Sequence, residues 1–312
     1  LKKKPENMSV GHFASPLWQE KYFAAYDELM AAMPQPSKVL DISTSWGIVR
    51  GYEWTNVQSA DIPPVVLLPG RSSGVPMWKD NLATIISEHT VYAFDALGDA
   101  GKSVQTVPFN GYEDVAGWMS ETIGALGAGK VHIAGHSFGG GFAANFAMLH
   151  PEQVATVALL DPAFALNYPS AAVLFWATVA SMSFLPKSWR DSGLAKMTGA
   201  AKEDVASDEQ MARMITTASA GYIAAKLPTP KTLSKEERAK FSLPLYVAIG
   251  GKSPITGAKA VKNAQSVANA TVRVYSDATH SLPMEYPEVV GAELNTFWRQ
   301  HETNRCKSDK WE

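Results

Sequence analysis

The stretch 131-VHIAGHSFGGG-141 predicts how this chain folds. Residues 131–134 are mainly apolar and have the form of a buried strand, and residues 142–149 continue as a mainly apolar helix. Between them, residues 135–139 fit the pattern G-x-S-x-G, whose small residues allow a tight turn. In this strand–turn–helix context the pattern lifts a serine hydroxyl above the sheet edge, so Ser137 is a candidate nucleophile. The alternative is a glycine-rich turn whose serine has no chemical role.

Further apolar runs of the same form surround this stretch. Predicted helices at 112–126, 138–149, 257–268 and 286–300 lie between most of them. The runs are 64–70, 90–98, 130–137, 154–162, 243–251 and 270–280, and 37–44 and 47–55 form a strand pair at an edge. Alternating strands and helices indicate a mostly parallel sheet flanked by helices, an α/β fold whose ligands bind at the carboxyl ends of the strands.

The pattern divides the 312 residues into parts. We expect an N-terminal helical extension (1–36), a core (37–162 and 243–300), an inserted helical cap (163–242) and a polar tail (301–312). The amphipathic helix 17–33 lies in the extension. The segment 171–185 is strongly apolar, but it is shorter than the roughly 20 residues of a membrane span. We expect a buried or pocket-lining helix there and no transmembrane segment.

Composition limits the classes of partner. The chain is 46% hydrophobic and 19% charged with a net charge of -2, which argues against nucleic acid or an anionic membrane as partner. The single cysteine, Cys306, allows no intrachain disulfide. No apolar signal segment follows Leu1, which favours a cytoplasmic location, although a cleaved signal stays open. The oligomeric state is not indicated.

A serine nucleophile needs a base and donors for the developing negative charge. His280 follows the last predicted strand and fits the base better than the other histidines, which lie near the ends, within or before strands, or beside the serine. The backbone N–H of Phe138 is one expected oxyanion donor, and that of Arg71, after the run 65–70, is the other. The sequence contains neither an H-E-x-x-H pair nor a Cys/His cluster, so we expect no metal and no cofactor.

The chain resembles the α/β-hydrolase superfamily, and within it the lid-bearing serine carboxylesterases. The resemblance runs from about Val65 to Trp298 and rests on "LLPGRSSG", "FDALGDAGKS", "GHSFGGG" and "THSLPMEYPE". It implies an α/β-hydrolase fold with a helical cap inserted after the sixth strand. The implied activity is cleavage of carboxylic esters through an acyl-enzyme intermediate.

One departure from the family pattern concerns the acid of the triad. The usual position, after the strand 243–250, is occupied by Ser253. Some members of the superfamily carry the acid one strand earlier, and here Asp161 ends the strand 154–160. Asp277 lies only three residues before His280 and would struggle to reach behind the imidazole. We therefore predict Asp161 as the acid, the alternative being that it only caps the turn before Pro162.

The cap is rich in aromatic residues. We expect Phe164, Tyr168 and Trp176 to line a substrate pocket for a small apolar or aromatic ester, unless these rings form the cap's own core. The same residues would serve a thioesterase, a lactonase or a carbon–carbon bond hydrolase. A hypothesis of another class is a ligand-binding or signalling protein that keeps the fold without efficient turnover.

Overall fold

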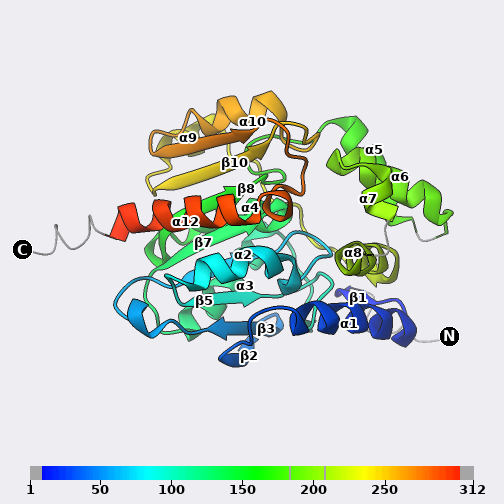
Figure 1. Cartoon of the computed structure of the whole chain (residues 1–312), viewed down its shortest axis with the longest axis horizontal. Helices are drawn as coiled ribbons and strands as arrows, with labels where there is room; N and C mark the ends of the chain where they lie inside the picture. Colours follow the sequence, from blue (N-terminus) through cyan, green and yellow to red (C-terminus); the bar gives the residue numbers. More distant parts are fainter. Residues whose placement is uncertain (1–8, 183, 207–208, 303–312) are drawn as a thin grey trace, which may run out of the picture.

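The computed structural model describes residues 9–182, 184–206 and 209–302. Within these ranges a large sheet has the strand order β11-β10-β8-β7-β4-β5-β3-β2, and β6 pairs with β3 (Figure 1). The strands are β2 (Lys38–Thr44), β3 (Gly47–Trp54), β4 (Val65–Leu68), β5 (Val91–Phe94), β6 (Val104–Gln105), β7 (Val131–His136), β8 (Val154–Leu160), β10 (Leu245–Gly250) and β11 (Ala270–Tyr275). A small second sheet pairs β1 (His12–Phe13) with β9 (Tyr222–Ile223).

The pairing directions explain the apolar runs. Strands β11 to β5 are mutually parallel, whereas β3 is antiparallel to β5 and β2 is antiparallel to β3. Every residue of β4, β7 and β10 is buried, as expected for strands covered on both faces. The prediction of a buried strand at 270–275 is wrong, because β11 has a neighbour on one side only and leaves several side chains exposed.

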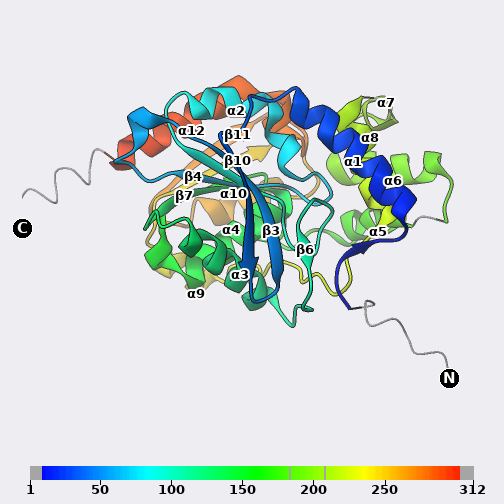
Figure 2. The same ribbon diagram turned by 90° about the horizontal axis from the view of Figure 1, so that it is seen from below.

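Helices cover both faces of the sheet. Figure 2 shows α2 and α12 on one face and α3, α4 and α10 on the other. The helices of this core are α2 (Lys79–Ile86), α3 (Tyr112–Ala125), α4 (Ser137–Leu149), α9 (Lys235–Lys240), α10 (Gly257–Ala264), α11 (Leu282–Glu285) and α12 (Pro287–Glu302). Each face has its own apolar cluster, one containing Trp118 and Phe146, the other Tyr26 and Trp298.

A helical segment lies between β8 and β10 and projects beyond the sheet (Figure 1). Its helices are α5 (Ala171–Ser181), α6 (Lys187–Thr198), α7 (Lys202–Ala206) and α8 (Gln210–Gly221). The N-terminal helix α1 (Pro16–Ala31) packs along α8, and Glu28 forms an ion pair with Arg213 at 2.5 Å. The extension that the sequence predicted is therefore attached to the cap, a contact that no sequence pattern indicated.

Two predicted segments differ in detail. Helix α5 buries Val173, Val179 and Ala180 but leaves Phe175 59% exposed, so this helix is only partly buried. Among the described residues, no helix combines the length and apolarity needed to cross a bilayer. Helix α12 continues to Glu302, so the predicted tail boundary at residue 301 falls inside it. Cys306 lies outside the described residues.

Candidate active site

The turn between β7 and α4 presents the side chain of Ser137. Ser137 has φ of +53°, a left-handed conformation that is uncommon for a residue with a side chain and clusters at functional sites. A Cβ on Gly135 would lie 2.3 Å from the carbonyl oxygen of Gly139, and a Cβ on Gly139 would lie 2.4 Å from that of Pro69. Both glycines are therefore required for β7, α4 and the loop after β4 to pass this closely.

Three side chains that are far apart in the sequence meet here. Ser137 Oγ lies 2.8 Å from Nε2 of His280, and Nδ1 of the same imidazole lies 2.5 Å from Oδ2 of Asp161. All three residues are buried, with exposed fractions of 6%, 6% and 0% in that order. The chain of contacts from hydroxyl through imidazole to carboxylate is the arrangement that allows a histidine to take a proton from a serine.

The loop after β11 supplies His280, and the cap holds this loop from outside. The backbone N–H of His280 donates to the carbonyl oxygen of Thr198 at the end of α6, at 2.9 Å. Its own carbonyl oxygen accepts a hydrogen bond from Nε2 of His136 at 2.8 Å. Burial lowers the pKa of His136 to about 3, so this imidazole is neutral near pH 7 and its Nε2–H is the donor.

Asp161 accepts hydrogen bonds from three groups in addition to His280. Its Oδ1 accepts from the backbone N–H of Gly250 at 3.0 Å and from Thr256 Oγ1 at 2.8 Å, and its Oδ2 accepts from Ser253 Oγ at 2.6 Å. Burial alone would raise the pKa of Asp161, but the hydrogen bonds from His280, Ser253 and Gly250 outweigh burial and lower it. The carboxylate therefore stays ionised beside the imidazole.

Sequence reasoning recognised Ser253 only as the residue in the usual position of the acid. In the structure its hydroxyl bonds to the carboxylate that comes from the neighbouring strand β8. Thr256 was not recognised at all. The signal that could have found both is the parallel pairing of β8 with β10, which places a hydroxyl-rich loop beside the end of β8.

Asp277 lies away from this group. Its side chain is 73% exposed and forms an ion pair with Lys252 at 3.1 Å. In the structure Asp161, and not Asp277, hydrogen-bonds to Nδ1 of His280. Asp161 has φ of +42°, which a residue that merely ended a strand would not need.

The backbone amides expected for an oxyanion lie at the edge of the same cavity. Phe138 is the second residue of α4, and Arg71 follows Gly70 in the loop after β4. Across the described residues neither amide has a hydrogen-bond acceptor within the protein. The loop is fixed by two hydrogen bonds, from Ser72 N–H to Asp99 at 2.8 Å and from Ser73 Oγ to the carbonyl of Gly70 at 2.6 Å.

A cavity of about 1090 Å³ opens above Ser137 and His280, between the core and the cap. Phe164 lines it, as expected. Tyr168 and Trp176 do not, and their prediction as lining residues is wrong. Tyr168 is 62% exposed and packs on the ring of Phe164, while Trp176 packs under the ammonium of Lys196 at 3.9 Å. The cap helices instead line the cavity with smaller and aliphatic side chains, among them Leu174, Ala177, Leu194, Met197 and Ile215.

Comparisons with known proteins agree with this geometry. The sequence profile of the alpha/beta hydrolase family matches residues 65–293. Carboxylesterase YbfK of Bacillus subtilis is 31% identical over 147 residues, and the uncharacterized carboxylesterase nap of the same organism is 35% identical over 147 residues. Each match covers 46% of this chain and 47% of the relative, so the chain spans about half the length of these relatives. The crystal structure of naproxen esterase from Bacillus subtilis superposes with a TM-score of 0.78 at 25% identity, covering 89% of this chain and 97% of that one.

Proposed function

The chain belongs to the alpha/beta hydrolase family, and from this membership we propose that it is a serine hydrolase that cleaves carboxylic esters. One observation carries the proposal: Ser137 Oγ, the imidazole of His280 and the carboxylate of Asp161 form a continuous hydrogen-bonded chain at the floor of a large cavity. Two relatives that are named carboxylesterases support the same reaction class.

In the proposed reaction Ser137 Oγ attacks the ester carbonyl carbon while Nε2 of His280 takes the hydroxyl proton. The carbonyl oxygen becomes an oxyanion, which the backbone N–H groups of Arg71 and Phe138 stabilise. Nε2–H then protonates the leaving alcohol, and the acyl group stays on Ser137. Asp161 keeps the proton on Nδ1, so that Nε2 faces the serine as an acceptor, and stabilises the imidazolium when it forms.

Deacylation repeats these steps with water as the nucleophile. His280 removes a proton from the water, and the same two backbone N–H groups stabilise the second tetrahedral oxyanion. His280 then returns a proton to Ser137 as the carboxylic acid leaves. The donors around Asp161 support both half-reactions, because they keep the carboxylate ionised and fixed in one orientation. This sequence of steps uses no metal ion or cofactor.

The cavity supports an apolar ester of small to medium size as the substrate. Its volume of about 1090 Å³ slightly exceeds the roughly 300–1,000 Å³ of typical ligand pockets. Phe138 and Phe164 form an edge-to-face pair beside the nucleophile, at 5.4 Å between ring centroids. We also propose that residues 163–242 form a cap over this site. The helices α5 and α6 of this segment supply much of the apolar wall of the cavity.

The test is a series of p-nitrophenyl esters of increasing acyl length, assayed with the parent protein and with Ser137→Ala. We expect kcat/KM to rise from acetate to a medium-length or aromatic acyl group, because the additional carbons enter the cavity. Ser137→Ala should abolish hydrolysis while the circular dichroism spectrum stays unchanged. Residual activity within tenfold of the parent would remove Ser137 from its role, and a preference for acetate over every larger group would contradict the proposed acyl site.

A further inference from the structure

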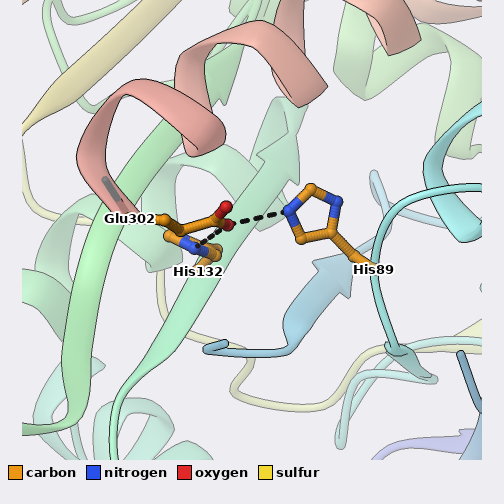
Figure 3. Close-up of side chains that lie close together, drawn as sticks. All are labelled: His89, His132 and Glu302. Atoms are coloured by element: carbon orange, nitrogen blue, oxygen red, sulfur yellow. Dashed lines mark hydrogen bonds and ion pairs between the residues drawn. The ribbon is translucent and has the colours of Figure 1, made fainter. Parts of the chain in front are cut away.

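A second group of side chains lies at the end of the sheet opposite Ser137. Figure 3 shows His89, His132 and Glu302, which come from three distant segments. His89 precedes β5, His132 is the second residue of β7, and Glu302 ends α12. The hydrolytic reaction uses none of them, because the five residue steps from His132 to Ser137, at about 3.3 Å each along β7, place this group roughly 16–17 Å from the nucleophile.

The two imidazoles converge on one carboxylate oxygen. Nε2 of His89 lies 2.9 Å from Oε1 of Glu302, and Nε2 of His132 lies 3.1 Å from the same oxygen. Figure 3 shows both rings directing these nitrogens at the carboxylate. His89 and His132 are 0% and 1% exposed, so two imidazoles sit in the interior with a carboxylate between them and solvent.

From this convergence we propose that His89, His132 and Glu302 form a structural site for a divalent transition-metal ion, with Zn²⁺ as the best fit. The three ligand atoms lie within 4.8 Å of one another. Zinc–nitrogen and zinc–oxygen bonds of about 2.0–2.2 Å in tetrahedral geometry separate ligand atoms by about 3.3 Å. The observed distances from the two Nε2 atoms to Oε1 of Glu302 are a few tenths of an ångström shorter. A small outward movement of Glu302, at the end of α12, opens the required space.

The surroundings orient the ligands as a metal site requires. Nδ1 of His132 lies 2.9 Å from Thr156 Oγ1, a contact that fixes the ring and leaves Nε2 to coordinate. Nδ1 of His89 is buried without a hydrogen-bond partner among the described residues, so this ring is oriented through its Nε2, which contacts Glu302. The ring of Trp298 packs against both imidazoles, at 5.1 Å from His89 and 5.8 Å from His132.

The donor set selects the class of ion. Two neutral imidazoles and one carboxylate are the ligands of many zinc sites, whereas Mg²⁺ and Ca²⁺ prefer oxygen ligands only. The side chain of Glu302 is 12% exposed, which gives an ion a path from solvent and leaves room for water as a fourth ligand. Since the ion would join α12 to β7 and to the loop before β5, its expected effect is on stability.

The test uses the full-length protein freed of metal with a chelator and then titrated with ZnCl₂. We expect about one equivalent of zinc to bind and the melting temperature to rise, because an ion that binds only the folded chain stabilises it. Loss of a second-shell partner weakens metal sites by about 10–100-fold, so Glu302→Gln and His89→Asn should weaken binding by at least about 100-fold. Ester hydrolysis below the melting temperature should be the same with and without zinc.

Glu88→Gln is the matched control. Glu88 joins the same loop to α12 through an ion pair with Arg299 at 2.5 Å, so its loss perturbs the same contact without removing a ligand. This variant should keep the zinc-dependent rise in melting temperature. Co²⁺ added to the parent protein should give the visible absorption of a tetrahedral nitrogen–oxygen site, a result that needs no variant to fold. Absence of that absorption, or equal zinc binding by parent and Glu302→Gln, would overturn the proposal.

Discussion

Replacement of Asp161 by asparagine tests how the carboxylate controls His280. The backbone N–H of Gly250 can only donate a hydrogen bond, and Thr256 also donates to Oδ1 of Asp161. The amide oxygen of the asparagine should therefore take the position of Oδ1. The new amide NH₂ group must then take the Oδ2 position, 2.5 Å from Nδ1 of His280. Because that NH₂ group donates, Nδ1 becomes an acceptor and the proton moves to Nε2, where it faces Ser137.

An imidazole with its proton on Nε2 cannot take the proton of Ser137. The equivalent exchange in a serine protease lowers kcat by about 10⁴, which corresponds to about 5 kcal/mol of transition-state stabilisation. We expect a loss of this size in kcat for p-nitrophenyl ester hydrolysis by Asp161→Asn. The volume of the side chain is nearly unchanged, so the protein should still fold.

Asp277→Asn is the control, because Asp277 is exposed and paired with Lys252. We expect its kcat to stay within about twofold of the parent. Steady-state kinetics of both variants, with circular dichroism to verify folding, make the comparison. A loss below tenfold for Asp161→Asn, or a larger loss for Asp277→Asn, would refute the assignment.

Two further predictions concern stability. Burial raises the pKa of Asp95 to about 6, so between pH 4 and 6 this carboxyl binds more protons in the folded state than in the unfolded state, and its contribution to the free energy of unfolding should fall by about 3 kcal/mol as the pH rises through that range. Urea unfolding should show a shallower fall of stability with rising pH in Asp95→Asn than in the parent, where the buried Asp99, whose pKa is also raised, keeps a part of the slope; equal slopes would contradict the assignment. Gly139→Ala should destabilise by more than about 1–3 kcal/mol, since its Cβ would lie 2.4 Å from the carbonyl oxygen of Pro69. Gly124→Ala on α3, where a Cβ meets no atom within 4 Å, should stabilise by up to about 1 kcal/mol, and destabilisation of both would contradict the packing argument.

The fold was predictable from the sequence because the local residue patterns match the strands and turns of the observed sheet. The apolar runs at β4, β7 and β10 became fully buried strands, and the G-x-S-x-G turn joins β7 to α4 as expected. The α/β-hydrolase fold and membership of that superfamily are confirmed by the family profile and by the superposed esterase. The edge position of β11 was missed, although the alternation of apolar and polar residues at the start of "ATVRVY" is a signal for a strand with an exposed face.

The candidate site was partly predictable for a similar reason. Ser137, His280 and Asp161 each follow a strand of one parallel sheet, and the carboxyl ends of such strands share an edge. Trp176 was misplaced because helical spacing does not say which face of α5 meets the cavity, and Tyr168 was misplaced because it lies in the loop before α5, whose direction the sequence does not indicate. The convergence of His89, His132 and Glu302 had no sequence signal, since these residues are brought together only by the packing of α12 on the sheet.

Labelling of Ser137 tests the central claim most directly. A fluorophosphonate probe forms a stable bond with a serine only when a base activates the hydroxyl and donors hold the phosphoryl oxygen, so it reports the whole proposed site. Intact-protein mass spectrometry should show rapid addition of one probe per chain, with the modified peptide containing Ser137 and with no addition to Ser137→Ala. A parent protein that stays unlabelled, or labelling that persists in Ser137→Ala, would contradict the account and favour a ligand-binding protein on the same fold.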